Sequence, residues 1–430
     1  MNLRDLESRV LSQPLERVEG RLVQAVGNLI ESEIPGAALG ALCTTESGAM
    51  CEVVGFRERR AILMPLDVVE NIVFGARVRL HDDAIRVPVG DALLGRIIDG
   101  LGRPIDDGPP LPLTPRRPLT GLAPPPMSRA IVSEPVVTGM RVIDGMLTLG
   151  KGQRIGIMAG SGVGKSTLLG SLARQMQVDV NVICLVGERG REVREFVEHS
   201  LGPEGLARSV VVVVTSDRSP ALQVKAPFLA TAIAEHFRDQ GRDVLLLVDS
   251  LTRLALAQRQ IGLAAGEPPT TRGFTPSVFS MLAPLLERAG PGRIGSITGI
   301  YTVLIEGDDL HDPIGDAVRG IVDGHIVLSR KLGSHGHYPA VDVLGSLSRI
   351  MDRLITPEHR AAASRVRSLM ATYQENEELV RLGAYRRGAS AEVDRALDRM
   401  PGILGFLKQG TAEPTAVADT VARLRKVAGD

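Results

Sequence analysis

The chain has 430 residues, of which 44% are hydrophobic and 23% are charged. Its length suggests about two to four domains at roughly 100–200 residues each, and its composition is typical of a globular protein with a sizeable core. Lys and Arg number 50, as do Asp and Glu, so the formal net charge is zero. This balance argues against a protein that holds nucleic acid or an anionic membrane mainly by bulk charge. The low aromatic content, 3%, argues against a platform that stacks the bases of single strands.

The cysteines and the N-terminus favour a cytoplasmic protein. Cys43, Cys51 and Cys184 form neither a C-x-x-C pair nor a zinc spacing, so reduced thiols are expected. No apolar run approaches the length of about 18 residues that indicates a membrane span. Charges are mixed throughout the N-terminal residues, which is not the pattern of a signal peptide.

The N-terminal part divides into a helix and a run of strands. Residues 1–19 are predicted to form a short helix, because Leu3, Leu6 and Val10 share one face and Pro14 should end it. That helix either packs as a terminus or docks a partner. Residues 20–88 contain short strand-like runs at regular spacing, which predict a small antiparallel barrel or sandwich.

The rest of the chain is predicted to be an α/β domain over residues 89–350 and a helical domain over residues 351–430. Nine prolines lie between Pro104 and Pro126, so this stretch is a linker and neither a helix nor a central strand. From Arg154 to about Arg349, short apolar runs alternate with helix-like segments, which indicates a largely parallel sheet. Beyond it the apolar residues have helical periodicity.

The first chemical motif is a glycine-rich loop between a strand-like run and a helix-like run. Glycines let backbone N–H groups approach phosphate oxygens, and the helix adds the positive end of its dipole. Lys165 is expected to reach the β- and γ-phosphates, and the Ser166 hydroxyl to bind Mg²⁺. Ala159 takes the place of the motif's first glycine. The residues expected to hold the nucleotide phosphates are Ala159, Gly160, Ser161, Gly162, Val163, Gly164, Lys165, Ser166 and Thr167.

Two acidic residues follow other apolar runs and are candidates for the same site. Asp249 ends the run Val244–Val248 and is expected to hold the Mg²⁺ shell through water. Glu188 follows the run Asn181–Val186, where a carboxylate could orient and polarise an attacking water. Taken alone, each pattern is also typical of a capped turn or a solvated loop.

Several long stretches together resemble the flagellar and type III secretion export ATPases, which are relatives of the catalytic subunit of the rotary ATP synthases. The resemblance runs from about Gly20 to about Gln409, and the flagellar branch looks closer than the injectisome branch. The stretches that carry it are VVTGMRVIDGMLTLGKGQRIGIMAGSGVGKSTLL, GERGREVREFVEHSLGPEGLARSVVVVVTSD, DVLLLVDSLTRLALAQRQIGLAAGEPPTTRGFTPSVFSMLAPLLERAG and YPAVDVLGSLSRIM.

The resemblance implies a RecA-like P-loop core with an N-terminal β-barrel and a C-terminal helical domain, assembled as a homohexamer. It implies that ATP and Mg²⁺ are bound, with Glu188 as the catalytic carboxylate and Arg189 near the γ-phosphate. Tyr338 matches an aromatic residue that packs on the adenine. Arg349 matches an arginine supplied across the subunit boundary.

The resemblance also implies partners and a location. The hydrolysis of ATP would power the export of unfolded proteins, with chaperone–substrate complexes, an export-gate stalk protein and a regulatory or stator protein as partners, the last through residues 1–19. The protein would be cytoplasmic and peripheral to the inner membrane at the export apparatus, with no specific nucleic acid. A rotary synthase subunit, a ring subunit that binds nucleotide without hydrolysis and a nucleic-acid translocase are the alternatives.

Two features depart from the family pattern or suggest something else. Asp312 and Gly315 stand where Glu and Ala are expected, so the local turn is expected to differ. His335 and His337 lie in a glycine-rich stretch; they are interpreted as surface residues in preference to metal ligands.

Overall fold

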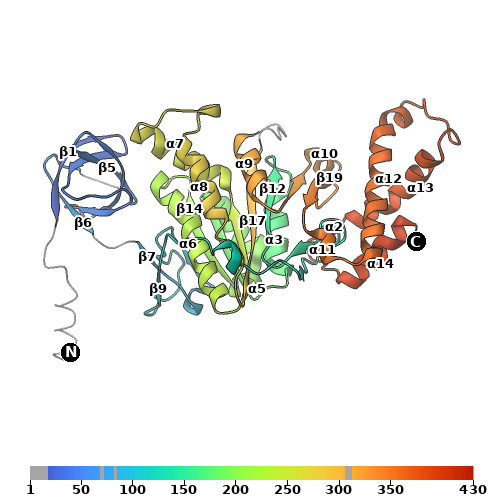
Figure 1. Ribbon diagram of the computed structural model, residues 1–430, viewed down its shortest axis with the longest axis horizontal. Coiled ribbons are helices and arrows are strands. Elements are labelled where there is room, and N and C mark those ends of the chain that lie inside the picture. Colours follow the sequence, from blue (N-terminus) through green and yellow to red (C-terminus); the bar gives the residue numbers. More distant parts are fainter. Residues whose placement is uncertain (1–17, 68–71, 82–84, 306–311, 430) are drawn as a thin grey trace.

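The structure is a computed structural model that describes residues 18–67, 72–81, 85–305 and 312–429. A small barrel, a central α/β unit and a group of helices follow one another along the long axis of the molecule (Figure 1). The helix expected over residues 1–19 lies outside the described residues, except for its last two, and Glu19 opens the first strand.

The N-terminal unit is a closed antiparallel barrel with the strand order β1-β2-β5-β4-β3-β6. Its strands are β1 (Glu19–Val26), β2 (Leu29–Glu33), β3 (Leu42–Thr45), β4 (Met50–Arg57), β5 (Arg60–Pro65) and β6 (Arg77–His81). Alternate side chains such as Leu22, Ile30 and Val78 fill the interior. Because the barrel is closed, none of its strands is an unpaired edge strand. Each short strand is therefore stabilised by hydrogen bonds to a neighbour on both sides. The predicted barrel is confirmed.

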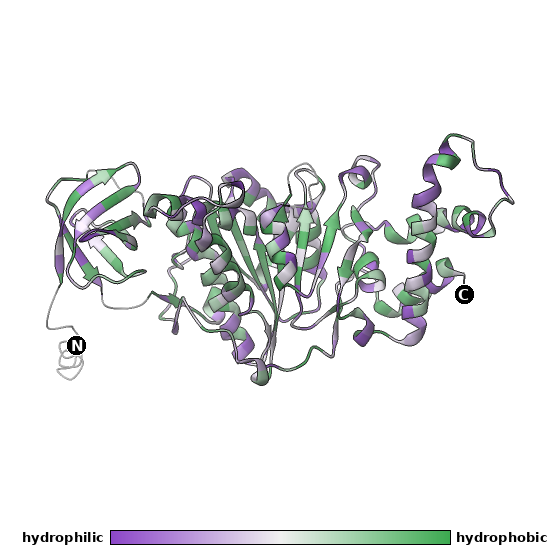
Figure 2. Ribbon diagram, turned by 45° about the horizontal axis from the view of Figure 1, so that its top comes forward, coloured by the Kyte–Doolittle hydropathy of each residue, from purple (hydrophilic) through white to green (hydrophobic). Residues whose placement is uncertain are grey.

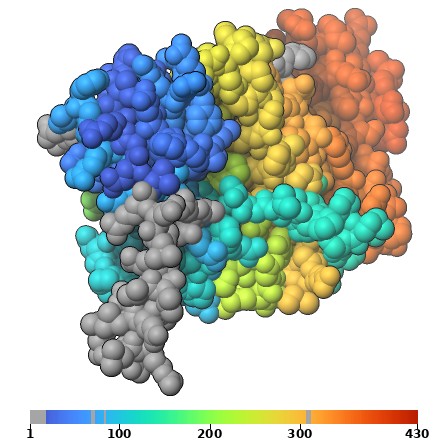
Figure 3. All heavy atoms as spheres, turned by 60° about the vertical axis from the view of Figure 1, so that its left-hand side comes forward, coloured from blue at the N-terminus to red at the C-terminus, as the bar shows by residue number. Residues whose placement is uncertain are grey.

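The barrel rests on the α/β unit through α6 (Pro220–Asp239) and α7 (Leu251–Ala265). Glu52 of β4 forms an ion pair with Lys225 of α6, and both side chains are nearly buried. A Cβ placed on Gly55 would lie 3.2 Å from the Ala265 Cβ, so the two backbones approach closely. Figure 3 shows the barrel in blue directly against the yellow region that holds α7.

The central unit is built on one sheet, which has nine strands among the described residues. Its main path runs in the order β19-β18-β12-β17-β15-β13-β14-β8, and only the edge strand β19 is antiparallel to its neighbour on that path. The strands are β8 (Ile97–Ile98), β12 (Arg154–Ala159), β13 (Val180–Glu188), β14 (Ser209–Thr215), β15 (Asp243–Asp249), β16 (Gly290–Pro291), β17 (Ser296–Leu304), β18 (Gly324–Leu328) and β19 (Val341–Ser348).

Both faces of the sheet are covered, which explains the continuous apolar runs. Along β13, Val182 and Cys184 pack into the core on one face, while Ile183 and Leu185 pack into the core on the other. Figure 2 shows these inner strands as mainly hydrophobic. The covering helices include α3 (Lys165–Gln175), α4 (Gly190–Glu195), η3 (Phe196–Leu201), α5 (Gly202–Ala207), α6, α7, α8 (Pro276–Leu286) and α9 (Pro313–Ile321). Parallel strands bring their carboxyl ends to one edge, where ligands bind in such sheets.

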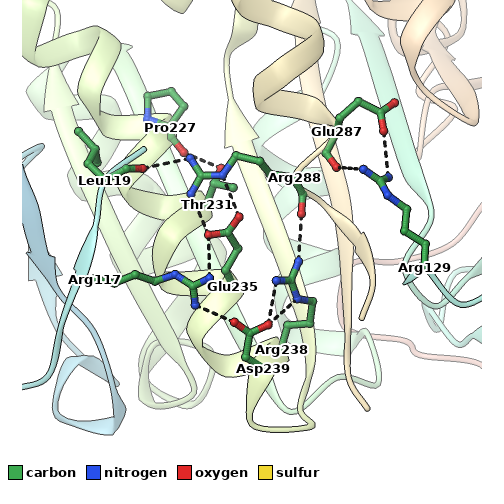
Figure 4. A network of polar contacts seen from close by, with 10 residues as sticks. All are labelled: Arg117, Leu119, Arg129, Pro227, Thr231, Glu235, Arg238, Asp239, Glu287 and Arg288. Atoms are coloured by element: carbon green, nitrogen blue, oxygen red, sulfur yellow. Dashed lines mark hydrogen bonds and ion pairs between the residues drawn. The ribbon is translucent and has the colours of Figure 1, made fainter. Parts of the chain in front are cut away.

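The proline-rich linker is tied to this unit by a buried ionic network (Figure 4). Arg288, after α8, is 1% exposed, and it forms a bidentate ion pair with Glu235 of α6 at 2.8 Å. Arg288 also donates to the Leu119 carbonyl of the linker at 3.1 Å. Arg117 of the linker pairs with both Glu235 and Asp239. The linker is therefore fixed against α6, although it has only short strand pairings such as β7 (Arg86–Pro88) with β9 (Arg116–Pro118).

The C-terminal unit is helical, as predicted. Its helices are α11 (Met351–Leu354), α12 (Pro357–Arg381), α13 (Ala391–Leu407) and α14 (Val417–Ala428). The last three of these helices pack on the short helix α2 (Arg141–Met146), which precedes β12 in the chain. None of the helices in the described ranges is long and apolar enough to cross a membrane.

We expect Arg288→Met to destabilise the fold by about 3–5 kcal/mol, because it removes one partner of a buried ion pair and leaves Glu235 poorly compensated. Chemical unfolding of the nucleotide-free protein measures this. Adding Glu235→Leu to Arg288→Met should recover part of the loss.

Arg387→Met is the control for the ionic network. Its pair with Asp398 is exposed, with 71% and 59% of the two side chains accessible, so it should cost less than about 1 kcal/mol. An Arg288→Met variant as stable as the Arg387→Met variant would show that the network does not hold the linker.

Candidate nucleotide site at the carboxyl edge of the sheet

The glycine-rich loop joins the end of β12 to the start of α3. Gly162 and Gly164 have φ angles of 77° and 89°, in the left-handed region that side chains disfavour, so these turns require glycine. Ala159 is the last residue of β12 and is fully buried in the core on the α3 side. Its position in the strand, before the loop turns, explains why a methyl group is accepted there.

The structure brings Lys165, Asp249 and Glu188 together beyond the ends of β12, β15 and β13. The Lys165 ammonium donates to Asp249 Oδ1 and lies 3.8 Å from Glu188 Oε1. Thr302 of the neighbouring strand β17 donates its hydroxyl to the same Asp249 oxygen at 2.7 Å. All three charged side chains are at most 15% exposed, so this cluster is preorganised and largely shielded from water.

A break in strand register directs Glu188 toward the loop. The pairing of β13 with β14 shifts by one residue between Val186 and Glu188, at Gly187, whose φ is 67°. Regular alternation would put Glu188 on the same face as Val186. The shift instead places it beside Leu185, on the side of α3, and both residues line the same cavity.

Burial in this cluster changes the acidity of Glu188. Loss of water contact is the largest cause that raises its pKa to about 7, and a hydrogen bond with Glu192 and the nearby Asp249 act in the same direction. The Lys165 ammonium opposes the shift. The pKa of Glu192 is lowered, first by the hydrogen bond from Glu188 and then by nearby arginines. Glu188 is therefore the more weakly acidic carboxyl group of the pair.

A cavity of about 420 Å³ opens beside the cluster. Ser166, Glu188 and Asp249 lie on its wall, together with Thr167, Leu185, Glu192, Val193, Glu195, Phe196, His199 and Ser200. The Ser166 hydroxyl and the Asp249 carboxylate are the hard oxygen donors that Mg²⁺ prefers. Mg²⁺ takes only one or two carboxylates and completes its shell with phosphates and waters. The donor set therefore fits the ion.

Arg253 is a residue of this site that the sequence motifs did not reveal. A Cβ placed on Gly187 would lie 3.0 Å from the Arg253 Cβ, so this arginine packs directly against the residue before Glu188. Its Nε is buried and has no hydrogen-bond partner in the described part of the chain. The only available signal was its position in the first turn of the helix that follows Asp249.

Tyr338 lies at the loop, whereas Arg189 does not reach the cluster. The ring of Tyr338 approaches Gly164, where an added Cβ would be 3.2 Å from it, and the residue is 46% exposed. Arg189 caps the start of α4, and its side chain is 78% exposed and pairs with Glu192 at 3.4 Å. Arg189 therefore lies outside the shielded cluster that contains Lys165.

Arg349 lies at the opposite edge of the sheet from Lys165 of the same chain. Its backbone N–H donates to the Asp323 carbonyl, and the N–H of Arg154, the first residue of β12, donates to the Asp323 side chain. Lys165 instead opens α3, after the loop that follows the last residue of that strand. A strand of six residues separates the two ends by about 16 Å. The Arg349 side chain is exposed, and its Nη2 donates to the Arg319 carbonyl.

The remaining sequence features have structural roles. Asp312 caps α9, and its Oδ1 accepts from the N–H groups of Ile314 and Gly315 at 3.0 and 2.9 Å. The departure from the family pattern therefore produces a capped helix start. His337 is buried, contrary to the expected surface position, because the C-terminal helices cover it, while His335 is exposed.

Comparison with protein families gives two matches that together cover most of the chain. Residues 139–348 match the nucleotide-binding domain of the ATP synthase alpha/beta family. Residues 355–426 match the C-terminal domain of the type III secretion ATPase EscN.

Relatives from flagella and from type III secretion systems are similar to this chain over nearly their full length. The flagellum-specific ATP synthase of Bacillus subtilis (strain 168) is 51% identical over 96% of this chain and 95% of its own. The type 3 secretion system ATPase of Xanthomonas euvesicatoria is 50% identical over 99% of this chain and 97% of its own.

Solved structures agree with these relatives. The assembled ATPase EscN from the enteropathogenic E. coli type III secretion system superposes with a TM-score of 0.92 at 46% identity, over 95% of this chain and 100% of that one. EscN in complex with its central stalk EscO gives a TM-score of 0.88 at the same identity and coverage. The expected fold, a P-loop core between a barrel and a helical unit, is confirmed. This chain belongs to the family of flagellum-specific and type III secretion ATPases within the ATP synthase alpha/beta group.

Proposed function

We propose that the cluster of Lys165, Glu188 and Asp249 binds and hydrolyses Mg-ATP, and that hydrolysis powers the export of unfolded proteins through a flagellar-type (type III) secretion apparatus. The observation that carries the proposal is the meeting of the Lys165 ammonium, the Asp249 carboxylate and a carboxyl group with a raised pKa, that of Glu188, behind one P-loop. Flagellar and injectisome relatives are equally similar, at 51% and 50% identity, and the chemistry proposed is the same for both.

Each residue contributes positioning or charge, because phosphoryl transfer to water requires little covalent help from the protein. The loop N–H groups and Lys165 hold the phosphates. Ser166 and Asp249 would hold Mg²⁺, which neutralises charge on the phosphate oxygens. Glu188 in its carboxylate form orients water and accepts a proton as the water oxygen bonds to the γ-phosphorus and the bond to the ADP oxygen breaks. A pKa of about 7 is well matched to proton transfer near neutral pH.

The arginine that stabilises the transition state comes from a neighbouring subunit in this proposal. Arg349 is exposed and lies a strand's length from the lysine of its own chain, so it is placed to act on another chain. The similarity to EscN in its assembled form supports a ring, for which we propose a homohexamer. Arg189, which is exposed, would approach the γ-phosphate only after α4 moves, whereas Arg253 packs against Gly187, the residue before Glu188.

The proposed partners follow from the same family. A stalk protein would bind the ring, as the structure of EscN with its central stalk suggests. Chaperone–substrate complexes and a regulatory or stator protein, the latter through residues 1–19, would bring the ATPase to the cytoplasmic side of the export apparatus. Copurification with export chaperones, and not with a proton-channel complex, separates this function from that of a rotary synthase.

We expect Glu188→Gln to bind Mg-ATP nearly as the wild type does, while turnover falls by about 10²–10⁴, because the amide keeps the shape but cannot accept a proton. Equilibrium binding and steady-state hydrolysis measure the two effects. Glu195→Gln is the matched control, since Glu195 lines the same cavity but is 59% exposed and pairs with Arg191. If Glu188→Gln weakens binding as much as turnover, Glu188 only shapes the loop.

The same Glu188→Gln variant should be more stable than the wild type at pH 8 without nucleotide. The native pKa of Glu188 lies near 7, above its ordinary value of 4.5, so folding favours the protonated form. That stabilisation is complete below about pH 4.5 and is lost as the pH rises through 7. The neutral amide does not lose it, so the variant gains about 1–3 kcal/mol at pH 8 and nothing at pH 4. Unfolding curves at both pH values test this, and an equal difference at both would contradict it.

Mixing two inactive variants tests whether Arg349 acts between subunits. Lys165→Ala lacks the phosphate lysine, and Arg349→Ala should lose about 10³–10⁵ in rate while still assembling. In mixed rings, an intact Lys165 of one chain can meet an intact Arg349 of the next, so hydrolysis should partly return.

Chains that carry both substitutions, mixed with Arg349→Ala chains, are the control and should recover nothing, because no subunit then supplies the arginine. Mixed rings of the two single variants that form but stay inactive would rule out action in trans.

A further inference from the structure

The C-terminal helices contact the nucleotide site through the residues that follow α13. The backbone N–H of Gln409 donates to the carbonyl of Tyr338 at 3.0 Å. The ring of Tyr338 in turn lies against Gly164 of the P-loop. A continuous path of contacts therefore runs from the end of α13 to the loop that holds the phosphates.

Gln409 is held by hydrogen bonds from its own side chain. It is 8% exposed, and its Oε1 accepts from the backbone N–H of Arg141 at 2.7 Å. Its Nε2 donates to the carbonyls of Gly139 and Glu413 at 2.8 and 2.5 Å. The amide thus connects the segment before α2 to the turn after α13, and it fixes the position of its own backbone N–H.

Arg141 reinforces the same junction. Its guanidinium donates to the carbonyls of Phe406 and Lys408, at the end of α13, and to the Thr415 hydroxyl. Burial lowers the pKa of Arg141, and these carbonyls satisfy its donors in place of a carboxylate. The end of α13 is therefore held firmly, so the Gln409 N–H is a fixed anchor for Tyr338.

Tyr338 needs such an anchor because burial does not hold it. It is 46% exposed, and its ring lies against Gly164 of a loop in which Gly162 has open space beside it. A half-exposed ring held only by its chain neighbours would sample several positions. The entropy lost in ordering the ring would then weaken the binding of a base.

We propose that Gln409 is a positioning residue for the nucleotide base: through the Tyr338 carbonyl it orders the aromatic ring, and it thereby sets the affinity for adenine without touching it. This inference rests on the proposed role of Tyr338 at the adenine. It also makes base binding and the packing of α13 on the core mutually dependent, since both use the same hydrogen bonds.

The test compares two ligands, Mg-ATP and Mg-tripolyphosphate, in the full-length protein. Both ligands contact the P-loop, but only ATP has a base. Gln409→Met keeps the length of the side chain and removes its hydrogen bonds, so the Kd for ATP should rise about tenfold while that for tripolyphosphate changes less than about twofold. In hydrolysis, the change should appear in KM more than in kcat.

A second variant and a matched control separate positioning from general loosening. Gln409→Glu keeps the acceptor for the Arg141 N–H but loses the donors, so it should raise the Kd for ATP selectively if Gln409→Met does not fold. His359→Leu removes a different contact between the C-terminal helices and α2, the hydrogen bond of its Nε2 with the Gly145 carbonyl at 2.8 Å. It should lower the unfolding temperature and leave the ratio of the two Kd values unchanged.

The outcomes distinguish this inference from the function on which it rests. Tyr338→Ala should change the ratio of the two Kd values at least as much as Gln409→Met. If Tyr338→Ala leaves the ratio unchanged, the adenine assignment of Tyr338 is wrong. If Tyr338→Ala changes it but the folded Gln409 variants do not, or if they weaken both ligands equally, Gln409 only joins the two units and the inference is overturned.

Discussion

A buried ammonium group between two carboxyl groups is the interaction on which the site depends. Ions removed from water must be paired, and Lys165 satisfies this requirement with Asp249 and Glu188. Burial of its carboxyl group, together with the hydrogen bond to Glu192 and the nearby Asp249, raises the pKa of Glu188 to about 7 although the Lys165 ammonium opposes the shift. The packing that brings Glu188 beside Lys165 and Asp249 is therefore also the packing that raises its pKa.

The parallel sheet makes this arrangement possible. Because β12, β13 and β15 end at one edge, residues separated by more than 80 positions in the chain become neighbours, as the bond between Lys165 and Asp249 shows. Thr302 adds a fourth strand to the same cluster. The barrel and the helical unit lie on either side of this sheet, and the site itself is built almost entirely from strand ends and the helices that follow them.

The sequence predicted this core well, because local patterns carry the necessary information. Apolar runs with a polar residue at the end located Asp249 and Glu188, and the glycine-rich loop located Lys165. Three features were not predictable, since each depends on tertiary packing. The one-residue register shift at Gly187, the contact of Arg253 with that glycine, and the path from Gln409 to Tyr338 all join segments with no common motif. The exposure of Arg189 was missed because adjacency in sequence to Glu188 says nothing about which way a side chain points once a helix begins.

The two edges of the central sheet give each subunit a polarity. Lys165 is at the carboxyl edge and Arg349 is at the amino edge, so an interface that joins them pairs unlike surfaces. Such head-to-tail contacts must either close into a ring or continue as a filament. An open pair of subunits has one joined interface and leaves one lysine without an arginine, whereas a closed ring leaves none. Under the proposed role of Arg349, an isolated subunit binds ATP without hydrolysing it, because the length of a β-strand keeps its own arginine away from its own phosphate site. Hydrolysis is therefore confined to the assembled ring.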